Sequence, residues 1–294
     1  VLPIVFLKYI SDAFEDTYDK LTEMGRDPDI RDEYIARGIF WVPENSRWTG
    51  IVKRAKDPAI GVIIDEAMES IGKENPELKN VLVTRFGQSD LSSRVLGEVV
   101  TLFGNVRSFG DEDARSKDII GRVYEYFIGK FAEAEKKGGG EFYTPRSVVR
   151  LLIEMLQPYK GRIYDGCCGS GGMFVQSHKF MDAHSGKLNV SVFGQESNPT
   201  TWRLAKMNLA TRQIEADLGD SWEDTLVKDL HPDLRADYVI TNPPFNIKDW
   251  GWEYLQDDPR WKKYGVPPKG NANFAWIQHY ISHLSPLGMA GIVM

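Results

Sequence analysis

The feature that most constrains the fold is an alternation of strand-like and helix-like runs that begins near residue 144. Helical spacing of apolar residues predicts helices, and short β-rich runs predict strands. The helices are expected at 144–156, 171–183, 198–212 and 273–284, and the strands at 162–165, 190–196, 236–241 and 288–294. The first of these helices should be capped by Thr144 and bury Val148, Leu151, Leu152 and Met155, and Asn198 should cap the third. Such alternation with short connections predicts an α/β fold with a parallel, doubly wound sheet, whose ligands bind beyond the carboxyl ends of the strands.

The front of the chain has a different pattern, because apolar residues recur there at three- and four-residue steps without strands. Helices are predicted within 4–21, 57–72 and 118–137. The second should bury one face made of Ile60, Ile63, Ile64, Ala67, Met68 and Ile71. A glycine run in "KKGGGEFYTPR" marks a flexible joint. We therefore predict an all-α N-terminal domain at 1–135 and a catalytic domain at 136–294.

Composition excludes several classes of protein. The net charge of −6 argues against a chain that coats nucleic acid by charge alone. The two cysteines, Cys167 and Cys168, are adjacent and fit neither a disulfide framework nor a zinc site. No apolar run is long enough to span a membrane, and no signal peptide is visible. The expected location is the cytoplasm. The start without Met and the strand-like end "GMAGIVM" suggest a longer natural protein, with the catalytic domain truncated at its C-terminal end.

The stretch "DGCCGSGGMF" at 165–174 follows one predicted strand and opens a predicted helix. Glycines there let the backbone approach a ligand, and the helix start offers free N–H groups. The stretch lacks the Lys of a P-loop and the last glycine of the dinucleotide fingerprint. A tight turn and a nucleotide-like cofactor site both remain open on this loop alone.

Glu196 ends the next predicted strand, about two dozen residues past the glycine loop. A carboxylate has two oxygens and so can accept both hydroxyl protons of a ribose. The alternative is a solvated glutamate at a strand end. Together with the glycine loop, Glu196 indicates a ribose site.

The stretch "ADYVITNPPFN" ends a third strand with two prolines, which cannot donate to a sheet. The Asn242 side chain offers a carbonyl acceptor, the carbonyl of Pro243 lacks a local partner, and Phe245 offers a flat face. An extruded base could donate its amino group to these two oxygens and stack on the ring. The alternative is an ordinary proline-rich turn.

In this order, "DGCCGSGGMF", "GQE" and "TNPPFN" resemble the amino-methyltransferases that use S-adenosyl-L-methionine. With "GGGEFYTPRSVVRLL", "VFLKYISDAFE" and "FWVPENSRW", the chain resembles the modification (M) subunit of type I restriction-modification systems, an adenine-N6 DNA methyltransferase. The resemblance implies a helical N-terminal domain and a Rossmann-like catalytic domain. It also implies DNA as substrate and a complex with a specificity (S) and a restriction (R) subunit, with two M subunits per S subunit.

The resemblance also implies roles for individual residues. The catalytic set is Asn242, Pro243, Pro244 and Phe245. The cofactor-binding set is Glu141, Phe142, Tyr143, Thr144, Pro145, Arg146, Asp165, Ser170, Gly171, Gly172, Glu196 and Asp224, with Asp217 and Asp220 as rivals of Asp224. The family usually has proline where this chain has Gly166, which puts the geometry of the loop in question. The two cysteines are expected to be structural.

Two alternatives compete with this hypothesis: a protein glutamine N5-methyltransferase, and a non-catalytic methyltransferase fold that serves as an assembly platform. No metal is expected. His279 and His283 have a possible ligand spacing, but no third ligand is evident in the sequence, so a packed pair is favoured. Trp250, Trp252 and Trp261 follow the catalytic motif and could either contact DNA or form a local core.

Overall fold

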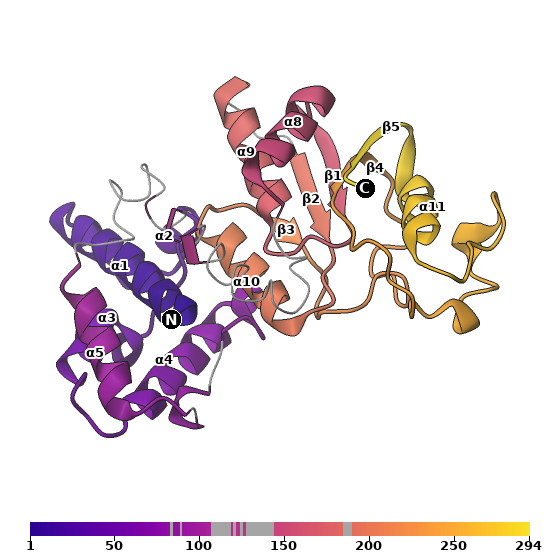
Figure 1. Cartoon of the computed structure of the whole chain (residues 1–294). Helices are drawn as coiled ribbons and strands as arrows, with labels where there is room; N and C mark the ends of the chain where they lie inside the picture. Colours follow the sequence, from indigo (N-terminus) through magenta and orange to yellow (C-terminus); the bar gives the residue numbers. More distant parts are fainter. Residues whose placement is uncertain are drawn as a thin grey trace. The chain divides into compact units, whose positions relative to one another are not determined.

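The computed structural model describes residues 1–82, 85–88, 90–106, 119, 122–123, 126–127, 144–184 and 190–294. The chain divides into two compact units, Val1–Phe127 with Thr211–Gln213, and Ile128–Ala210 with Ile214–Met294. Figure 1 traces both units. The predicted domain boundary at 135/136 lies outside the described residues and stays a prediction. No helix in the described part is long and apolar enough to cross a lipid bilayer.

The first unit is helical where it is described. Its helices are α1 (Leu2–Glu23), α2 (Asp32–Ile35), α3 (Trp48–Lys53), α4 (Ile60–Glu74) and α5 (Ser93–Gly104), with 3-10 turns at Glu44–Ser46, Pro76–Leu78 and Phe86–Gln88. Helix α1 is buried on nearly every side, which makes it the core of the unit. The predicted apolar face of α4 is confirmed, because all six of its residues are buried. The helix predicted at 118–137 lies largely outside the described residues.

The second unit contains a five-stranded sheet of β1 (Gly161–Asp165), β2 (Val190–Gly194), β3 (Ala216–Asp217), β4 (Ala236–Thr241) and β5 (Leu284–Ile292). The strand order is β3-β2-β1-β4-β5, and every pairing is parallel. Four longer helices, α8 (Arg146–Leu156), α9 (Gly172–His184), α10 (Pro199–Ala210) and α11 (Asn273–His283), accompany the strands. The predicted α/β, doubly wound fold is confirmed.

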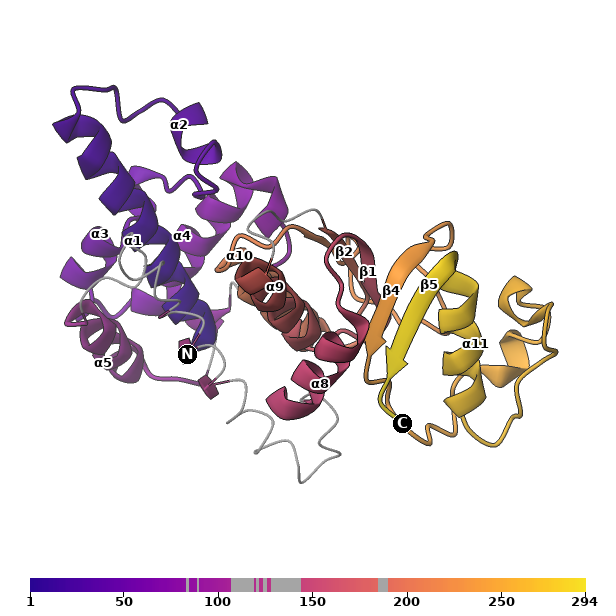
Figure 2. The same ribbon diagram turned by 90° about the horizontal axis from the view of Figure 1, so that it is seen from above.

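The chain winds outward in two directions from the middle of this sheet. Strands β1 to β3 follow one another toward one edge, whereas β4 starts again on the other side of β1. Helices α8, α9 and α10 lie on one side of the sheet and α11 on the other (Figure 2). A ligand crevice is expected at the reversal between β1 and β4, beyond the carboxyl ends of the strands.

Helix α8 buries a different face from the one predicted. Of the four residues predicted to face inward, Met155 and Leu151 are 71% and 60% exposed, and Val148 and Leu152 are only half-buried. The buried residues are instead Val149 and Ile153. The helix carries apolar residues at helical spacing on more than one face, so periodicity alone does not select the buried one.

The starts of the helices test two predicted caps. Asn198 is confirmed as a cap of α10, because its Oδ1 accepts from the N–H groups of Thr200 and Thr201 at 2.9 and 3.1 Å. Thr144 was expected to cap α8, but no side chain caps that helix. Its hydroxyl instead accepts a hydrogen bond from Asn242.

Candidate active site

The glycine loop joins β1 to α9 at the expected crevice. Asp165 ends β1 with 1% exposure, and its Oδ1 accepts from the N–H of Cys167 at 3.1 Å and from Thr241 Oγ1 at 2.6 Å. Gly169 and Gly171 have φ of 54° and 78°, which is the left-handed region that favours glycine. The turn therefore needs its glycines, and it leads directly into α9 at Gly172.

Burial raises the pKa of the Asp165 carboxyl to about 7. The hydrogen bonds from Thr241 and Cys167 act in the opposite direction, and the nearby Glu196 carboxylate raises the pKa further. An acid buried this deeply at the end of β1 is typical of a functional site.

Gly166 occupies a position where the structure has little space. A Cβ at this position would lie 3.0 Å from the Tyr164 hydroxyl, 3.1 Å from Thr225 Cγ2 and 3.2 Å from Tyr280 Cε1. The Gly166 carbonyl accepts the hydroxyl proton of Thr225. The loop is thus tightly held without the family's proline.

Both cysteines are free, and burial raises the pKa of each thiol well above its ordinary value. Neutral, packed thiols are consistent with the structural role that the sequence predicts for Cys167 and Cys168.

Glu196 lies just beyond β2 and faces the glycine loop. Its Oε2 accepts from the N–H of Gly169 at 3.0 Å, and its Oε1 accepts from the N–H of Asn198 at 2.7 Å. Glu196 is 6% exposed. Burial raises the pKa of its carboxyl, although the hydrogen bonds from the backbone act in the opposite direction. In the described part of the chain Oε2 takes only this one bond, so it keeps a lone pair for a ligand hydroxyl.

The acidic segment after β3 also reaches this edge, because the N–H of Glu223 donates to the Glu196 carbonyl at 3.0 Å. Asp224 is exposed, and its Oδ1 accepts from the N–H groups of Leu226 and Val227. Asp217, at the end of β3, accepts a hydrogen bond at its Oδ1 from the N–H of Gly219 at 2.9 Å. The exposed Asp220 is in no such turn within the described residues.

Asn242 follows β4 directly and is held from one side only. Its Nδ2 donates to Thr144 Oγ1 at 3.0 Å, whereas its Oδ1 is buried without a hydrogen-bond partner in the described structure. A buried acceptor without a donor costs about 1–3 kcal/mol, so such atoms in native proteins call for an explanation. Pro243 is buried, and Phe245 is 38% exposed. The motif therefore combines an unused acceptor with an accessible aromatic ring.

The loop after Phe245 is fastened to the start of α11. Asn246, at φ 59°, donates its N–H to Asn273 Oδ1 at 2.9 Å, and Asn273 Nδ2 returns a bond to Asn246 Oδ1 at 3.1 Å. This pair fixes the chain just past the ring of Phe245.

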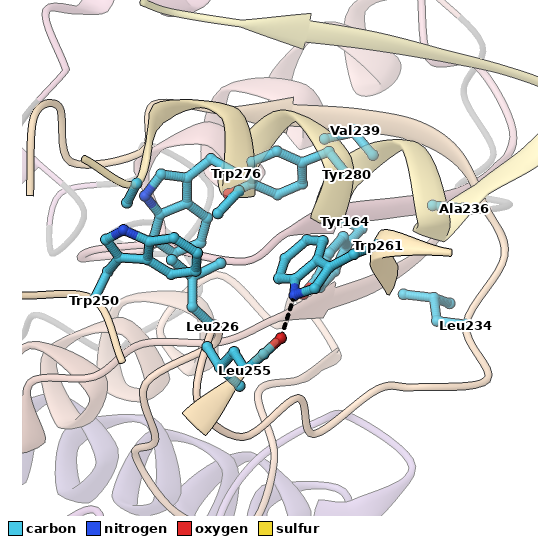
Figure 3. Packing of buried hydrophobic residues seen from close by; sticks show 12 residues of the cluster. Tyr164, Leu226, Leu234, Ala236, Val239, Trp250, Leu255, Trp261, Trp276 and Tyr280 are labelled. Carbon is cyan, nitrogen blue, oxygen red and sulfur yellow. Dashed lines mark hydrogen bonds between the residues drawn. The ribbon is translucent and has the colours of Figure 1, made fainter. Parts of the chain in front are cut away.

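The tryptophans after the motif form a local core. Trp250 and Trp261 are each 2% exposed and belong to a cluster with Trp276 and Tyr280 of α11 (Figure 3). Trp252 packs against this cluster. Of the two alternatives for these tryptophans, the structure favours the core.

A buried histidine pair lies beneath the site. His279 Nε2 lies 2.9 Å from the Tyr164 hydroxyl, and its Nδ1 lies 3.0 Å from Arg260 NH1. Asp229 Oδ2 lies 3.1 Å from His283 Nε2, and so supplies a third potential ligand that the sequence did not reveal. The guanidinium of Arg260 already faces His279, and burial lowers the pKa of the His279 ring well below its ordinary value. We therefore interpret the two histidines and Asp229 as a packed hydrogen-bonded network.

The structure thus gathers Thr144, Asp165, Glu196 and Asn242 at one edge of the sheet. Glycine-loop residues Ser170 to Gly172 and the exposed Pro145 and Arg146 adjoin them in sequence. The predicted residues Glu141, Phe142 and Tyr143 lie outside the described part. Sequence reasoning missed the supporting roles of Thr225 and Arg260, whose residue types carry no motif.

Two family models match the chain. The model described as N-6 DNA Methylase matches residues 115–294, and the model described as HsdM N-terminal domain matches residues 1–103. Together they match the whole chain except residues 104–114.

Similar proteins include methylase subunits of type I restriction enzymes. The chain is 44% identical over 260 residues to the type I restriction enzyme HindI methylase subunit of Haemophilus influenzae, covering 86% of this chain and 56% of that protein. It is 39% identical over 319 residues to the MjaIX methylase subunit of Methanocaldococcus jannaschii, covering 100% of this chain and 56% of that protein. The chain thus spans little more than half the length of these relatives.

Solved structures support the fold. The methyltransferase subunit of a type I restriction-modification system from Streptococcus thermophilus has a TM-score of 0.79 at 23% identity, covering 99% of this chain and 68% of that one. A modification subunit of a putative type I restriction enzyme from Vibrio vulnificus has a TM-score of 0.65 at 19% identity, covering 99% and 65%.

Proposed function

We propose that this chain, which belongs to the N-6 DNA Methylase family and is similar to type I restriction enzyme methylase subunits, transfers a methyl group from S-adenosylmethionine to the N6 amino group of adenine in DNA. The observation that carries this proposal is the buried Oδ1 of Asn242 beside the β1/β4 reversal, which has no hydrogen-bond partner among the described residues.

The chemistry of the acceptor follows from the motif. A flipped adenine would donate one amino hydrogen to Asn242 Oδ1 and the other to the Pro243 carbonyl, and would stack on the exposed ring of Phe245. Pro244 would hold the turn in which these groups sit. The two hydrogen bonds that the amino group donates would leave the lone pair of its nitrogen directed at the methyl group and would make that nitrogen more nucleophilic. The transfer would need no covalent intermediate with the protein. Thr144 keeps the amide oriented because it binds the opposite end of that side chain.

The donor side of the proposed reaction fits the cofactor. Bound S-adenosylmethionine would supply an electrophilic methyl group. Glu196 has an acceptor position left for a ribose hydroxyl, and the backbone of the turn from Asp165 to Gly172 would approach the ligand closely. We propose that Ser170, Gly171 and the segment from Glu141 to Arg146 complete this site.

The adenine of the cofactor would face an acidic residue after β3. The sequence favours Asp224, although its Oδ1 already binds two turn N–H groups. The exposed Asp220 is therefore a stronger rival than the sequence suggests. Single alanine substitutions of Asp217, Asp220 and Asp224, compared by cofactor affinity, distinguish them.

We further propose assembly in the cytoplasm with a specificity and a restriction subunit, with two of these chains per specificity subunit. A solved structure with a TM-score of 0.64 and 21% identity comes from work on complex assembly of the type I system. Light scattering on the co-purified complex measures this ratio.

The first test of the function is calorimetry of the chain with S-adenosylmethionine, NAD and ATP. We expect selective binding of S-adenosylmethionine that weakens at least tenfold in Glu196→Ala, since a charged hydrogen bond contributes about 1.5–3 kcal/mol. Selective binding of NAD or ATP, or binding of none of the three, would contradict the proposal.

The second test is methyl transfer to DNA by the reconstituted complex. Asn242→Ala should abolish transfer while leaving cofactor binding intact, and Asn105→Ala in the helical unit serves as the control. Transfer to a protein glutamine would instead support the glutamine methyltransferase, and cofactor binding without any transfer would support the assembly platform.

A further inference from the structure

Four side chains form a hydrogen-bonded group next to Asn242, where β1 and β4 end: Asp165, Cys167, Thr241 and Tyr280. Thr241 Oγ1 donates to Asp165 Oδ1 at 2.6 Å and lies 3.0 Å from the Tyr280 hydroxyl. Cys167 Sγ lies 3.0 Å from the same Tyr280 hydroxyl and 3.4 Å from Thr241 Oγ1. Thr241 and Tyr280 are fully buried, and Asp165 is 1% exposed. These three side chains are thus shielded from water, while Cys167 is half-buried.

When Asp165 is ionised, the direction of the hydrogen bond between Thr241 and Asp165 is fixed. A carboxylate only accepts, so the single hydroxyl proton of Thr241 goes to Asp165. The Tyr280 hydroxyl can then donate to Thr241, and the Cys167 thiol can donate to Tyr280. Thr241 thus joins the Tyr280 hydroxyl to the carboxylate, which Cys167 also contacts through its own N–H and its thiol.

The position of Thr241 gives this link a consequence. The residue lies immediately before Asn242, and its partner Asp165 begins the glycine loop. The main chain of Thr241 is held separately, because its carbonyl accepts from Val293 N–H at 3.0 Å and it pairs with Ile292 in the sheet. Loss of the hydroxyl would therefore leave the strand paired in the sheet and remove the hydrogen bond to Asp165.

We propose that the Thr241 hydroxyl is a positioning group that couples the cofactor loop to the catalytic asparagine, by tying Asp165 to the strand end that presents Asn242. This inference rests on the proposed function, since it assigns a cofactor to the loop and catalysis to Asn242. Thr241 itself touches neither substrate nor cofactor. It acts through Asp165.

The test compares Thr241→Val, which keeps the shape and removes the hydroxyl, with Thr241→Ser, which keeps the hydroxyl. Thr17→Val is the control, because that buried threonine donates to a helix carbonyl in the other unit. We expect Thr241→Val to weaken S-adenosylmethionine binding about tenfold and to lower kcat of the reconstituted complex. Thr241→Ser should stay within about twofold of wild type, since it preserves the hydrogen bond.

A second readout needs no cofactor. Carboxyl NMR, assigned with Asp165→Asn, follows the titration of Asp165 in the free chain. Burial raises the pKa of this carboxyl and the Thr241 hydrogen bond lowers it, so Thr241→Val should raise it further. The other ionisable groups that face Asp165 are Glu196, Cys167, Cys168, Tyr164 and Tyr280, and all of them are kept in the variant.

The outcomes separate the two proposals. If wild type binds no S-adenosylmethionine, the proposed function fails, while a shifted titration still supports the link between Thr241 and Asp165. An unchanged titration in Thr241→Val overturns the inference whatever the cofactor does. Wild-type affinity and kcat in Thr241→Val also overturn it, because the link would then have no effect on the site.

Discussion

Arg260 offers the sharpest test of how the site is supported. Its side chain is 8% exposed, and its Nε and NH2 bind the Asp258 carboxylate at 2.8 and 2.7 Å. NH1 donates to the Thr225 carbonyl at 3.0 Å and faces His279 Nδ1 at 3.0 Å, while NH2 also donates to the Leu226 carbonyl. This guanidinium therefore joins the segment after the catalytic motif to the segment that holds the glycine loop.

Arg260→Met removes the charge and keeps much of the side-chain volume. In the described part of the structure, the Asp258 carboxylate would lose both bonds from the guanidinium and keep only the one from the N–H of residue 260, while two carbonyls and one ring nitrogen would lose a donor. Breaking a buried ion pair by removing one partner costs about 3–5 kcal/mol. Asp258 is 15% exposed and stays partly hydrated, so we expect about 3 kcal/mol, the lower end of that range.

Urea unfolding followed by tryptophan fluorescence measures this loss, because Trp250, Trp261 and Trp276 lie in the adjoining cluster. Arg235→Met is the matched control. Arg235 also donates to two backbone carbonyls but is exposed, so its loss should cost less than about 0.5 kcal/mol. A loss below about 1 kcal/mol in Arg260→Met would refute the view that this arginine holds the site together.

Three further predictions follow from the geometry. Glu196→Gln turns one carboxylate oxygen into a donor that faces a backbone N–H, such as that of Gly169, and should lower the stability measured by thermal melting by about 1–3 kcal/mol; an unchanged melting temperature would contradict the two hydrogen bonds that Glu196 accepts. The pKa of Asp165 is raised from 3.8 to about 7 on folding, so the folded state binds the extra proton and stability should fall as pH rises from 4 to 7; urea titrations should show this slope flattened in Asp165→Asn. Gly194→Ala places a Cβ 2.9 Å from two side chains and should destabilise by about 1–3 kcal/mol, whereas Gly172→Ala meets nothing within 4 Å and should be near neutral; equal losses would refute this packing.

Local patterns in the sequence were sufficient for much of the fold. The burial of α4 followed from its spacing, because one apolar face leaves a single way to pack. The parallel sheet followed from alternation of strands and helices. For α8 the same reasoning was wrong, since apolar residues on several faces leave the choice to tertiary contacts. Strand order was likewise beyond reach, because nothing local records which strand lies beside β1.

The candidate site divides in the same way, between groups that would meet a ligand and groups that hold them. Asn242 and Glu196 were recognisable because the proposed chemistry restricts their residue type and their place at a strand end. Their supports are ordinary residues whose partners are distant in sequence: Thr144 lies 98 positions from Asn242, and Thr241 lies 76 positions from Asp165.

A threonine has no distinctive type for such a role, because any hydroxyl at that point in space could make the bond. The fold alone brings the hydroxyl there, through the parallel pairing of β4 with β1. Sequence motifs can therefore identify the residues that would react. The residues that orient them are identified only by the folded structure. For that reason Thr241→Val and Arg260→Met test the structural argument more directly than substitution of Asn242, whose loss the motif alone predicts.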